Sequence, residues 1–386
     1  NNNNNNNVSL DSSTLSLNIS SLDSSIIFVN SSNIPENPKW NEIEFQETCY
    51  SVWSRNNVEY DTSIVRIGYS SFVTPKSIID VNFHTSEKNI LKVHEVPNYE
   101  PQNYLVRRIF AKSNHTDNVS IPISLVFHRS LVQNPDNENE LPNNRPVLLY
   151  GYGSYGISID PSFDYKRLPL LNRGIVYAIA HIRGGGEMGR HDWYEVGGKY
   201  LTKMNTFYDF KDSAVHLIGQ NVTTSNQIAI VGRSAGGLLI GATINLFPQY
   251  FKAAVADVPF VDVVNTMSDP TIPLTVGEWE EWGNPNEKVY YDYMSQYCPY
   301  TNVKAQNYPA LLITAGLHDP RVAYWEPLKW INKLREYKTD SNLLLLEIDT
   351  SSGHFSASDR YKGIKQQAFE MSFVVNQITG EGGKIE

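Results

Sequence analysis

The second part of this chain alternates continuous apolar runs with segments of helical character, and this alternation restricts its fold more than any other feature. A strand that is apolar at every position is buried on both faces, as in a parallel sheet covered by helices. Such runs span residues 146–150 and 174–180, and further strands are predicted over residues 227–231, 252–257, 310–314 and 343–348. Helices are predicted over 235–247 and 324–335, and a third after an N-cap at Asn205 has one apolar face made by Phe207, Phe210, Ala214 and Leu217. The pattern predicts an α/β fold with a doubly wound, mostly parallel sheet.

The first part of the chain has a different pattern. It begins with seven Asn residues and no Met, so we expect the chain to be the later part of a longer protein. Residues 1–35 are rich in Asn and Ser, a low-complexity composition. From about residue 39 to 103, short alternating stretches such as 62–68 and 77–82 are separated by turn-prone residues, which is typical of an antiparallel β-module. We therefore predict a boundary between residues 1–103 and an α/β domain over 104–386.

Composition excludes several classes of function. The 32 basic and 41 acidic residues give a net charge of −9 without a local basic patch, so we expect no nucleic-acid partner. No apolar run approaches the ~20 residues of a membrane span, so no membrane partner is expected. Cys49 and Cys298 lie far apart, which suits a reducing compartment and predicts a cytoplasmic location. The absence of an HExxH motif or a Cys/His cluster predicts no metal site, and we expect no cofactor.

The strongest local motif is Gly232-Arg-Ser234-Ala-Gly236-Gly237, between an apolar run and a predicted helix. A G-x-S-x-G sequence at a strand-to-helix turn lifts the serine hydroxyl above the sheet edge. The following amide, that of Ala235, then lies at a helix N-terminus, where it can donate to a developing oxyanion. The motif predicts that Ser234 is a nucleophile.

A serine nucleophile needs a histidine base and an acid that orients it, and in α/β-hydrolases these follow in the order Ser, acid, His. Asp319 follows the run 310–314, and His354 follows the run 343–348. An isolated histidine is more often a packing or surface residue. Here chain order and loop position agree, so we predict His354 as base and Asp319 as acid, with His318 as a neighbour.

A glycine-rich segment, Tyr150-Gly-Tyr152-Gly-Ser-Tyr-Gly156, follows the first buried run. Tyr152 can supply a second oxyanion donor through its hydroxyl. The segment also contains the G-x-G-x-x-G of a dinucleotide site, but that site needs a helix at once, and Ile157-Ser-Ile-Asp-Pro161 follows instead. Residues 181–189 are also glycine-rich, yet no Gly-Lys-Ser/Thr completes a P-loop. We therefore prefer the oxyanion role.

From about Arg66 to Lys362 the sequence resembles the prolyl oligopeptidase family of serine peptidases, and within it the oligopeptidase B branch. The resemblance rests on seven runs in one order: LYGYGSYG (149–156), RGGGEMGRHDWYEVGGK (183–199), NTFYDF (205–210), GRSAGGLL (232–239), VPFVDVVNTM (258–267), EWEEWGNP (278–285) and GLHDPRVAYWEP (316–327). Membership implies an α/β-hydrolase domain capped by a β-propeller, which admits short peptides, and cleavage after Arg or Lys.

The resemblance also implies roles for individual residues. Ser234, Asp319 and His354 match the catalytic triad, and Tyr152 and the Ala235 amide match the oxyanion hole. Substrate-binding roles are implied for Glu278, helped by Glu280, for Phe260 beside the cationic side chain before the cleaved bond (P1), and for Arg321, which would hold a substrate carbonyl or carboxylate. A carboxylate and an aromatic face suit a guanidinium. Without the resemblance, Glu278, Glu280 and Glu281 would be interpreted as a solvated acidic patch.

Two departures from the family pattern leave alternatives open. After His354 the chain reads Phe-Ser-Ala-Ser-Asp instead of a glycine-rich stretch. Residues 1–103 suffice for about two propeller blades at ~40–45 residues each, whereas a closed propeller needs about four. The leading hypothesis is a serine endopeptidase for short basic peptides. The alternatives are a Pro-specific oligopeptidase, a generic esterase or acylaminoacyl hydrolase, and an inactive truncated or split-gene fragment that lacks an N-terminal propeller segment.

Overall fold

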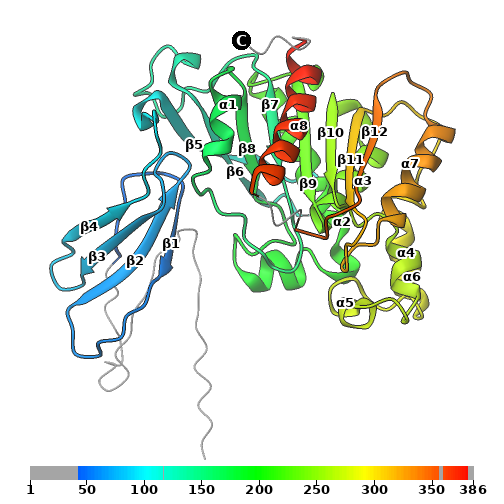
Figure 1. Ribbon diagram of the computed structural model, residues 1–386, viewed down its shortest axis with the longest axis horizontal. Coiled ribbons are helices and arrows are strands. Elements are labelled where there is room, and N and C mark those ends of the chain that lie inside the picture. The colour runs from blue at the N-terminus through cyan, green and yellow to red at the C-terminus, as the bar shows by residue number, and fades with distance from the viewer. Residues whose placement is uncertain (1–41, 116, 356–359, 381–386) are drawn as a thin grey trace, which may run out of the picture.

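A computed structural model describes residues 42–115, 117–355 and 360–380, and the strands of these residues form two sheets (Figure 1). The smaller sheet is antiparallel and contains, in spatial order, β1 (Tyr50–Ser54), β2 (Ile64–Ser71), β3 (Ser77–Asn82) and β4 (Lys88–Val93). The larger sheet has the strand order β12-β11-β10-β9-β7-β8-β6-β5. Its strands are β5 (Tyr104–Lys112), β6 (Ser120–His128), β7 (Val147–Tyr150), β8 (Val176–Ala180), β9 (Ile228–Arg233), β10 (Ala253–Asp257), β11 (Ala310–Gly316) and β12 (Leu344–Asp349).

The larger sheet is parallel from β12 to β8 and antiparallel only at the β6–β5 edge. Its six parallel strands coincide with the six strands predicted from the sequence in this part of the chain, so the predicted mostly parallel sheet is confirmed. The antiparallel edge was not predicted. Strand β6 is buried at seven consecutive positions, whereas β5 mixes buried, half-buried and exposed positions without a period of two. Strand β5 therefore has neither the continuous pattern of a strand buried on both faces nor the alternating pattern of a strand buried on one face.

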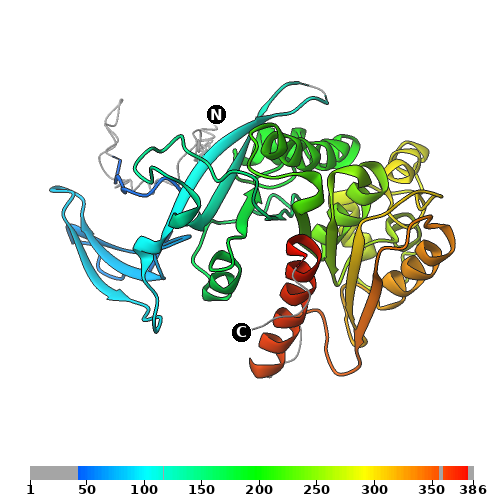
Figure 2. The same ribbon diagram turned by 90° about the horizontal axis from the view of Figure 1, so that it is seen from above.

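Helices cover both faces of the larger sheet (Figures 1 and 2). One apolar core joins the sheet to α2, α3 and α7 through residues such as Phe210, Leu238 and Trp330. A second core on the opposite face joins it to α1 and α8. The helices are α1 (Leu168–Leu171), α2 (Met204–Gly219), α3 (Ala235–Leu246), α4 (Val263–Ser268), α5 (Thr275–Trp282), α6 (Lys288–Tyr297), α7 (Trp325–Tyr337) and α8 (Arg360–Thr379).

One predicted helix cap is wrong. Asn205 is the second residue of α2, and its side-chain amide donates to the carbonyl of Gly197 (3.0 Å) instead of closing the helix start. The chain already enters a single helical turn at Tyr200–Thr202, so α2 begins before the residue that would have capped it. The four apolar residues predicted for one face of this helix are all buried.

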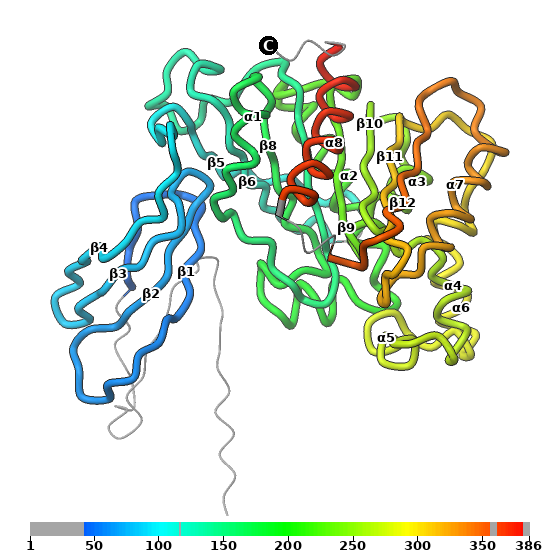
Figure 3. The backbone as a smooth tube through the Cα atoms, viewed as in Figure 1, coloured from blue at the N-terminus to red at the C-terminus, as the bar shows by residue number. Residues whose placement is uncertain are grey.

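The smaller sheet lies beside the β5–β6 edge of the larger sheet, at the opposite side from α7 (Figure 3). Its own core is small and centres on Ile67, Tyr69 and Val81. Four antiparallel strands are the size of one propeller blade. The rest of the two predicted blades falls on residues 1–41, which lie outside the described residues. The boundary predicted after residue 103 falls between β4 and β5, the last and first strands of the two sheets.

Candidate active site

The turn between β9 and α3 presents Ser234 in a strained backbone conformation. Its φ of 58° and ψ of −117° lie in a region that non-glycine residues seldom adopt. A Cβ atom on Gly232 would collide with the carbonyl of Gly236, and one on Gly237 would collide with Pro259. The turn is therefore this tight because the motif supplies glycine on both sides of the serine.

Ser234, His354 and Asp319 are brought together at the carboxyl ends of β9, β12 and β11. The imidazole of His354 lies with Nε2 3.1 Å from Ser234 Oγ and with Nδ1 2.7 Å from Asp319 Oδ2. The side chains of His354 and Asp319 are only 5% and 1% exposed. This is the spacing of a nucleophile, a base and an orienting acid.

The second oxygen of Asp319 is held by the backbone. Oδ1 accepts hydrogen bonds from the N–H groups of Arg321 (2.8 Å) and Val322 (3.0 Å). Burial opposes ionisation of this carboxyl, but the hydrogen bonds from His354 and these amides outweigh it and hold its pKa below the usual value. Asp319 is thus an ionised acceptor that keeps a proton on Nδ1 of His354. The predicted neighbour His318 is exposed, and its backbone N–H donates to Ser352 (3.0 Å).

Arg233, the residue before Ser234, contacts the backbone of His354. Its guanidinium donates to the carbonyl oxygen of His354 and to the carboxylate of Asp257. Asp257 also accepts from the hydroxyl of Thr314 (2.6 Å). No role was predicted for Arg233 from the sequence, although this residue lies inside the G-x-S-x-G motif.

A pocket of about 300 Å³ opens beside Ser234. It is lined by five further predicted site residues: Tyr152, Ala235, Phe260, Glu278 and Arg321. Glu280 is absent from this lining. It is exposed, with a carboxylate oxygen 3.5 Å from the hydroxyl of Tyr200, because residues two apart on α5 point to nearly opposite sides of the helix.

The carboxylate of Glu278 is fixed by two donors that the sequence analysis did not find. Its Oε2 accepts from the hydroxyl of Tyr155 (2.8 Å) and the indole N–H of Trp282 (2.9 Å). Burial and the charge of Glu278 raise the pKa of Tyr155, so this hydroxyl remains a donor. The ring of Phe260 lies 5.5 Å from that of Trp282, which completes an aromatic wall near the carboxylate.

Two groups near Ser234 are suited to bind an oxyanion. Ala235 is the first residue of α3, so its N–H precedes the hydrogen-bond ladder of that helix. Burial, followed by the charges of Glu281 and Glu278, raises the pKa of Tyr152 to about 12, which keeps its hydroxyl protonated near neutral pH. Both residues line the Ser234 pocket.

Comparison with known proteins identifies the family. Residues 161–381, more than half of the chain, match the prolyl oligopeptidase family of peptidases. The chain belongs to the prolyl oligopeptidase family. Among its curated relatives, Protease 2 from Moraxella lacunata is 43% identical over 87% of this chain, and Dipeptidyl aminopeptidase BI from Pseudoxanthomonas mexicana is 40% identical over 87%. These alignments cover 47% and 45% of the two relatives, so the chain spans about half their length.

Solved structures of prolyl oligopeptidases and oligopeptidases B have the same fold over most of this chain. Oligopeptidase B from Leishmania major superposes with a TM-score of 0.81 at 50% identity, covering 88% of this chain and 46% of that one. Oligopeptidase B from Trypanosoma brucei superposes with a TM-score of 0.80 at 51% identity, covering 88% of this chain and 47% of that one. Prolyl oligopeptidase B from Galerina marginata shares 28% identity at a TM-score of 0.77. The predicted similarity to the oligopeptidase B branch and the α/β-hydrolase fold are confirmed.

This member of the prolyl oligopeptidase family also contains a second serine, histidine and carboxylate arrangement, which we call the buried array. Ser124 Oγ in β6 lies 2.6 Å from His181 Nε2, and His181 Nδ1 lies 3.5 Å from Glu187 Oε1. Ser124 is fully buried and His181 is 2% exposed, and none of the three lines the Ser234 pocket. Glu187 also accepts from the N–H of Ile159 (3.0 Å), so the array ties a glycine-rich loop to the sheet.

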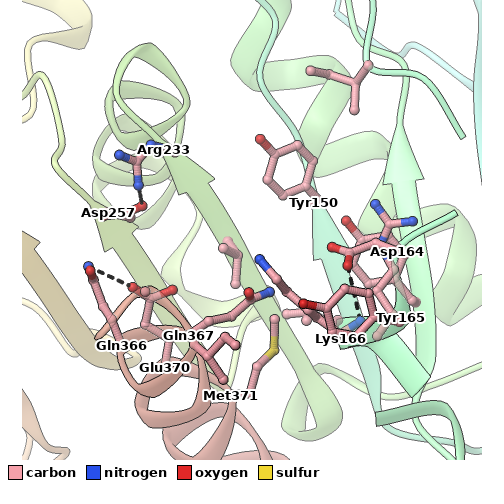
Figure 4. Close-up of a pocket in the computed structure, with 17 residues that line it drawn as sticks. Tyr150, Asp164, Tyr165, Lys166, Arg233, Asp257, Gln366, Gln367, Glu370 and Met371 are labelled. Carbon is pink, nitrogen blue, oxygen red and sulfur yellow. Dashed lines mark hydrogen bonds and ion pairs between the residues drawn. The ribbon is translucent and has the colours of Figure 1, made fainter. Parts of the chain in front are cut away.

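A larger pocket, of about 620 Å³, lies between the sheet and α8 and contains none of Ser234, Asp319 and His354 (Figure 4). Arg233 and Asp257 lie at one end of it. Glu370 of α8 and Lys166 also line it. Burial and the charge of Asp257 raise the pKa of Glu370 to about 8. Two of its lining residues contact the predicted triad: Arg233 donates to the carbonyl of His354, and the carbonyl of Asp257 accepts from the N–H of Ser234 (2.9 Å).

Among the described residues there is no group of three or more His, Cys, Asp and Glu side chains arranged to hold a metal ion. None of the described helices has the length and apolar character needed to span a membrane. The two cysteines, Cys49 and Cys298, are buried free thiols.

Proposed function

We propose that this chain carries the catalytic unit of a serine endopeptidase that hydrolyses short peptides after Arg or Lys. The observation that carries this proposal is the position of Glu278, whose carboxylate lines the same pocket as Ser234. The half-buried carboxylate of Glu278, with two fixed donors on one oxygen, retains acceptor capacity for a guanidinium or ammonium group. A hydrolase without selectivity for cations would have no need of a charge in that position.

In the proposed reaction, Ser234 Oγ attacks the carbonyl carbon of the scissile bond while His354 Nε2 takes the hydroxyl proton. Asp319 keeps the imidazole oriented and stabilises its charged form. The N–H of Ala235 and the hydroxyl of Tyr152 donate to the oxyanion. His354 then returns the proton to the leaving amine, which departs and leaves an acyl-enzyme. Water attacks this ester with His354 again as base, and the carboxylic acid and Ser234 are released.

Specificity is proposed to come from three side chains around the pocket. Glu278 pairs with the cationic P1 group, and Phe260 offers an aromatic face beside it. Arg321 lies with its guanidinium 4.9 Å from the ring of Phe355 and is proposed to hold a substrate carbonyl or carboxylate. The T. brucei relative has been solved with antipain covalently bound, which supports a covalent mechanism in this family.

The remaining assignments rest on the sequence. Residues 1–103 are proposed as part of a β-propeller and 104–386 as the catalytic domain, with the preference for short peptides following from the propeller cap. A cytoplasmic location is proposed from the two free thiols.

The test is the ratio of kcat/KM values for N-blocked anilides of Arg, Lys, citrulline and Pro. Citrulline has nearly the shape of Arg without its charge. We expect kcat/KM for the Arg and Lys anilides to exceed that for the citrulline anilide by about 100-fold, since citrulline gives the charge of Glu278 no cationic partner. Faster cleavage of the Pro anilide would contradict the specificity. Cleavage only of unblocked dipeptide anilides would favour the activity named for the P. mexicana relative. A chain that neither cleaves nor reacts with a fluorophosphonate would be an inactive fragment.

A further inference from the structure

The loop Gly151–Gly156, which we call the tyrosine loop, carries two side chains that the proposed function uses. Tyr152 lines the pocket as an oxyanion donor, and Tyr155 donates to Glu278. After Tyr152, the loop is held at Gly153, Ser154 and Tyr155 by two charged side chains that do not line the pocket. These are Lys203, just before α2, and Glu281, in α5.

Lys203 is 1% exposed. Its ammonium donates to the carbonyl of Gly153 and to the hydroxyl of Ser154 (2.9 Å), and it lies 5.2 Å from the centre of the Trp282 ring. Burial lowers the pKa of Lys203 to about 8, although the charge of Glu281 opposes this shift. A cation in such a place is retained at an energetic cost, so its contacts must serve a purpose that an apolar side chain would not.

Glu281 is 3% exposed and holds the next residue of the loop. Its Oε1 accepts from the backbone N–H of Tyr155 (2.9 Å), and its Oε2 accepts from the hydroxyl of Tyr194 (2.6 Å). Neither Glu281 nor Lys203 lines the Ser234 pocket, so neither is placed to touch a substrate. Both contact the tyrosine loop through its main chain or Ser154.

We propose that Lys203 and Glu281 are positioning residues that fix successive residues of the tyrosine loop and so place the Tyr152 hydroxyl at the oxyanion. Lys203 holds the acceptor groups of Gly153 and Ser154, and Glu281 holds the donor of Tyr155. The two opposite charges thus fix the three residues that follow Tyr152: Gly153, Ser154 and Tyr155. This inference rests on the proposed function, because it assigns Tyr152 a role in the reaction.

A double-mutant cycle tests whether Glu281 acts through Tyr152. Glu281→Gln should lower kcat for an Arg anilide by about 10- to 100-fold, since small displacements of a catalytic group have effects of this size. Tyr152→Phe removes the hydroxyl itself. In the double variant, Glu281→Gln should lower kcat by less than about threefold relative to the Tyr152→Phe single variant. A kcat loss in the double variant equal to the product of the two single losses would overturn the proposal. Glu287→Gln, an exposed substitution near α6, is the matched control and should match the parent.

Amide hydrogen exchange provides a readout that needs no turnover. In the full chain, Glu281→Gln and Lys203→Met should each raise exchange at least about tenfold in the peptide that contains residues 151–156, while Glu287→Gln leaves it unchanged. Lys203→Met and Glu281→Gln remove different contacts of the loop. If one of the two variants does not fold, the other still tests the proposal. Unchanged exchange in a folded variant would overturn the inference. A parent chain without activity would instead overturn the proposed function, and the exchange result would still decide whether the loop is held.

Discussion

Among the residues that the structure describes, one array of serine, histidine and carboxylate contains Ser234 and another contains Ser124, and the surroundings of these two arrays differ. Ser234 sits on a strained turn at a helix N-terminus, beside a 300 Å³ pocket. Ser124 lies within strand β6, fully buried, with a serine–histidine distance of 2.6 Å that is shorter than the 3.1 Å at Ser234. Hydrogen-bond distance therefore does not identify a catalytic serine. Access to a pocket and donors for the oxyanion do.

The largest expected effect separates the two serines directly. Ser234→Ala should lower kcat for an Arg anilide by about 10⁵-fold, because no other group in the pocket can form the acyl-enzyme. Ser124→Ala should keep kcat/KM within about threefold and cost about 1 kcal/mol of unfolding free energy for one lost hydrogen bond. Steady-state kinetics and thermal melting measure both. Equal losses of activity in the two variants would remove the distinction.

The next effect concerns Tyr152, which lines the pocket of Ser234 and is proposed as an oxyanion donor. Tyr152→Phe should lower kcat by about 10²-fold with little change in KM, since the hydroxyl acts on charge that develops in the transition state. The loss should be similar for Arg and Lys substrates. A rise in KM with unchanged kcat would instead make Tyr152 a ground-state binding residue.

A third effect tests the charge in the pocket. Glu278→Gln should lower kcat/KM for an Arg anilide by about 100-fold and leave the citrulline anilide within about threefold. Glu280→Gln should change neither substrate by more than threefold, because the structure turns Glu280 away from the pocket. Equal effects of Glu278→Gln on both anilides would favour a generic esterase or acylaminoacyl hydrolase.

The smallest effect is a pH dependence of stability at the buried array. Burial lowers the pKa of His181 in the folded state, although the hydrogen bond to Glu187 opposes the shift. The unfolded state then binds the proton more tightly, so stability is present above about pH 6.5 and is lost as the pH falls below it, by at most about 1.4 kcal/mol per pH unit. The His181→Gln variant lacks this titrating imidazole. The melting temperatures of parent and variant should approach each other from pH 7.5 to 5.5, whereas a constant difference would refute the shift.

The sequence predicted the parts of this site that depend on local motifs and chain order. The apolar runs located the six parallel strands, and the elbow motif with Asp319 and His354 in order predicted three side chains that lie together. The roles of Tyr155 and Glu281 depend on contacts between α5 and a loop more than 120 residues earlier in the chain. No pattern within either segment reveals such contacts. Glu280 was chosen over Glu281 because the sequence does not show which face of α5 turns inward.

The buried array shows the converse limit. Ser124, His181 and Glu187 belong to no recognisable motif, and only the pairing of β6 with β8 brings Ser124 beside the residue that follows β8. A search for serine and histidine pairs in the folded chain would return both arrays. Physical context separates them: Ser234 combines a positive φ, a helix N-terminus and a pocket, and Ser124 has none of these.

The most direct test of this account is to locate the adduct of a fluorophosphonate on the full chain by peptide mass spectrometry. The account predicts one phosphonylated serine, Ser234, with labelling abolished by Ser234→Ala and retained in Ser124→Ala. An adduct on Ser124, or a folded chain that takes up no label, would contradict it.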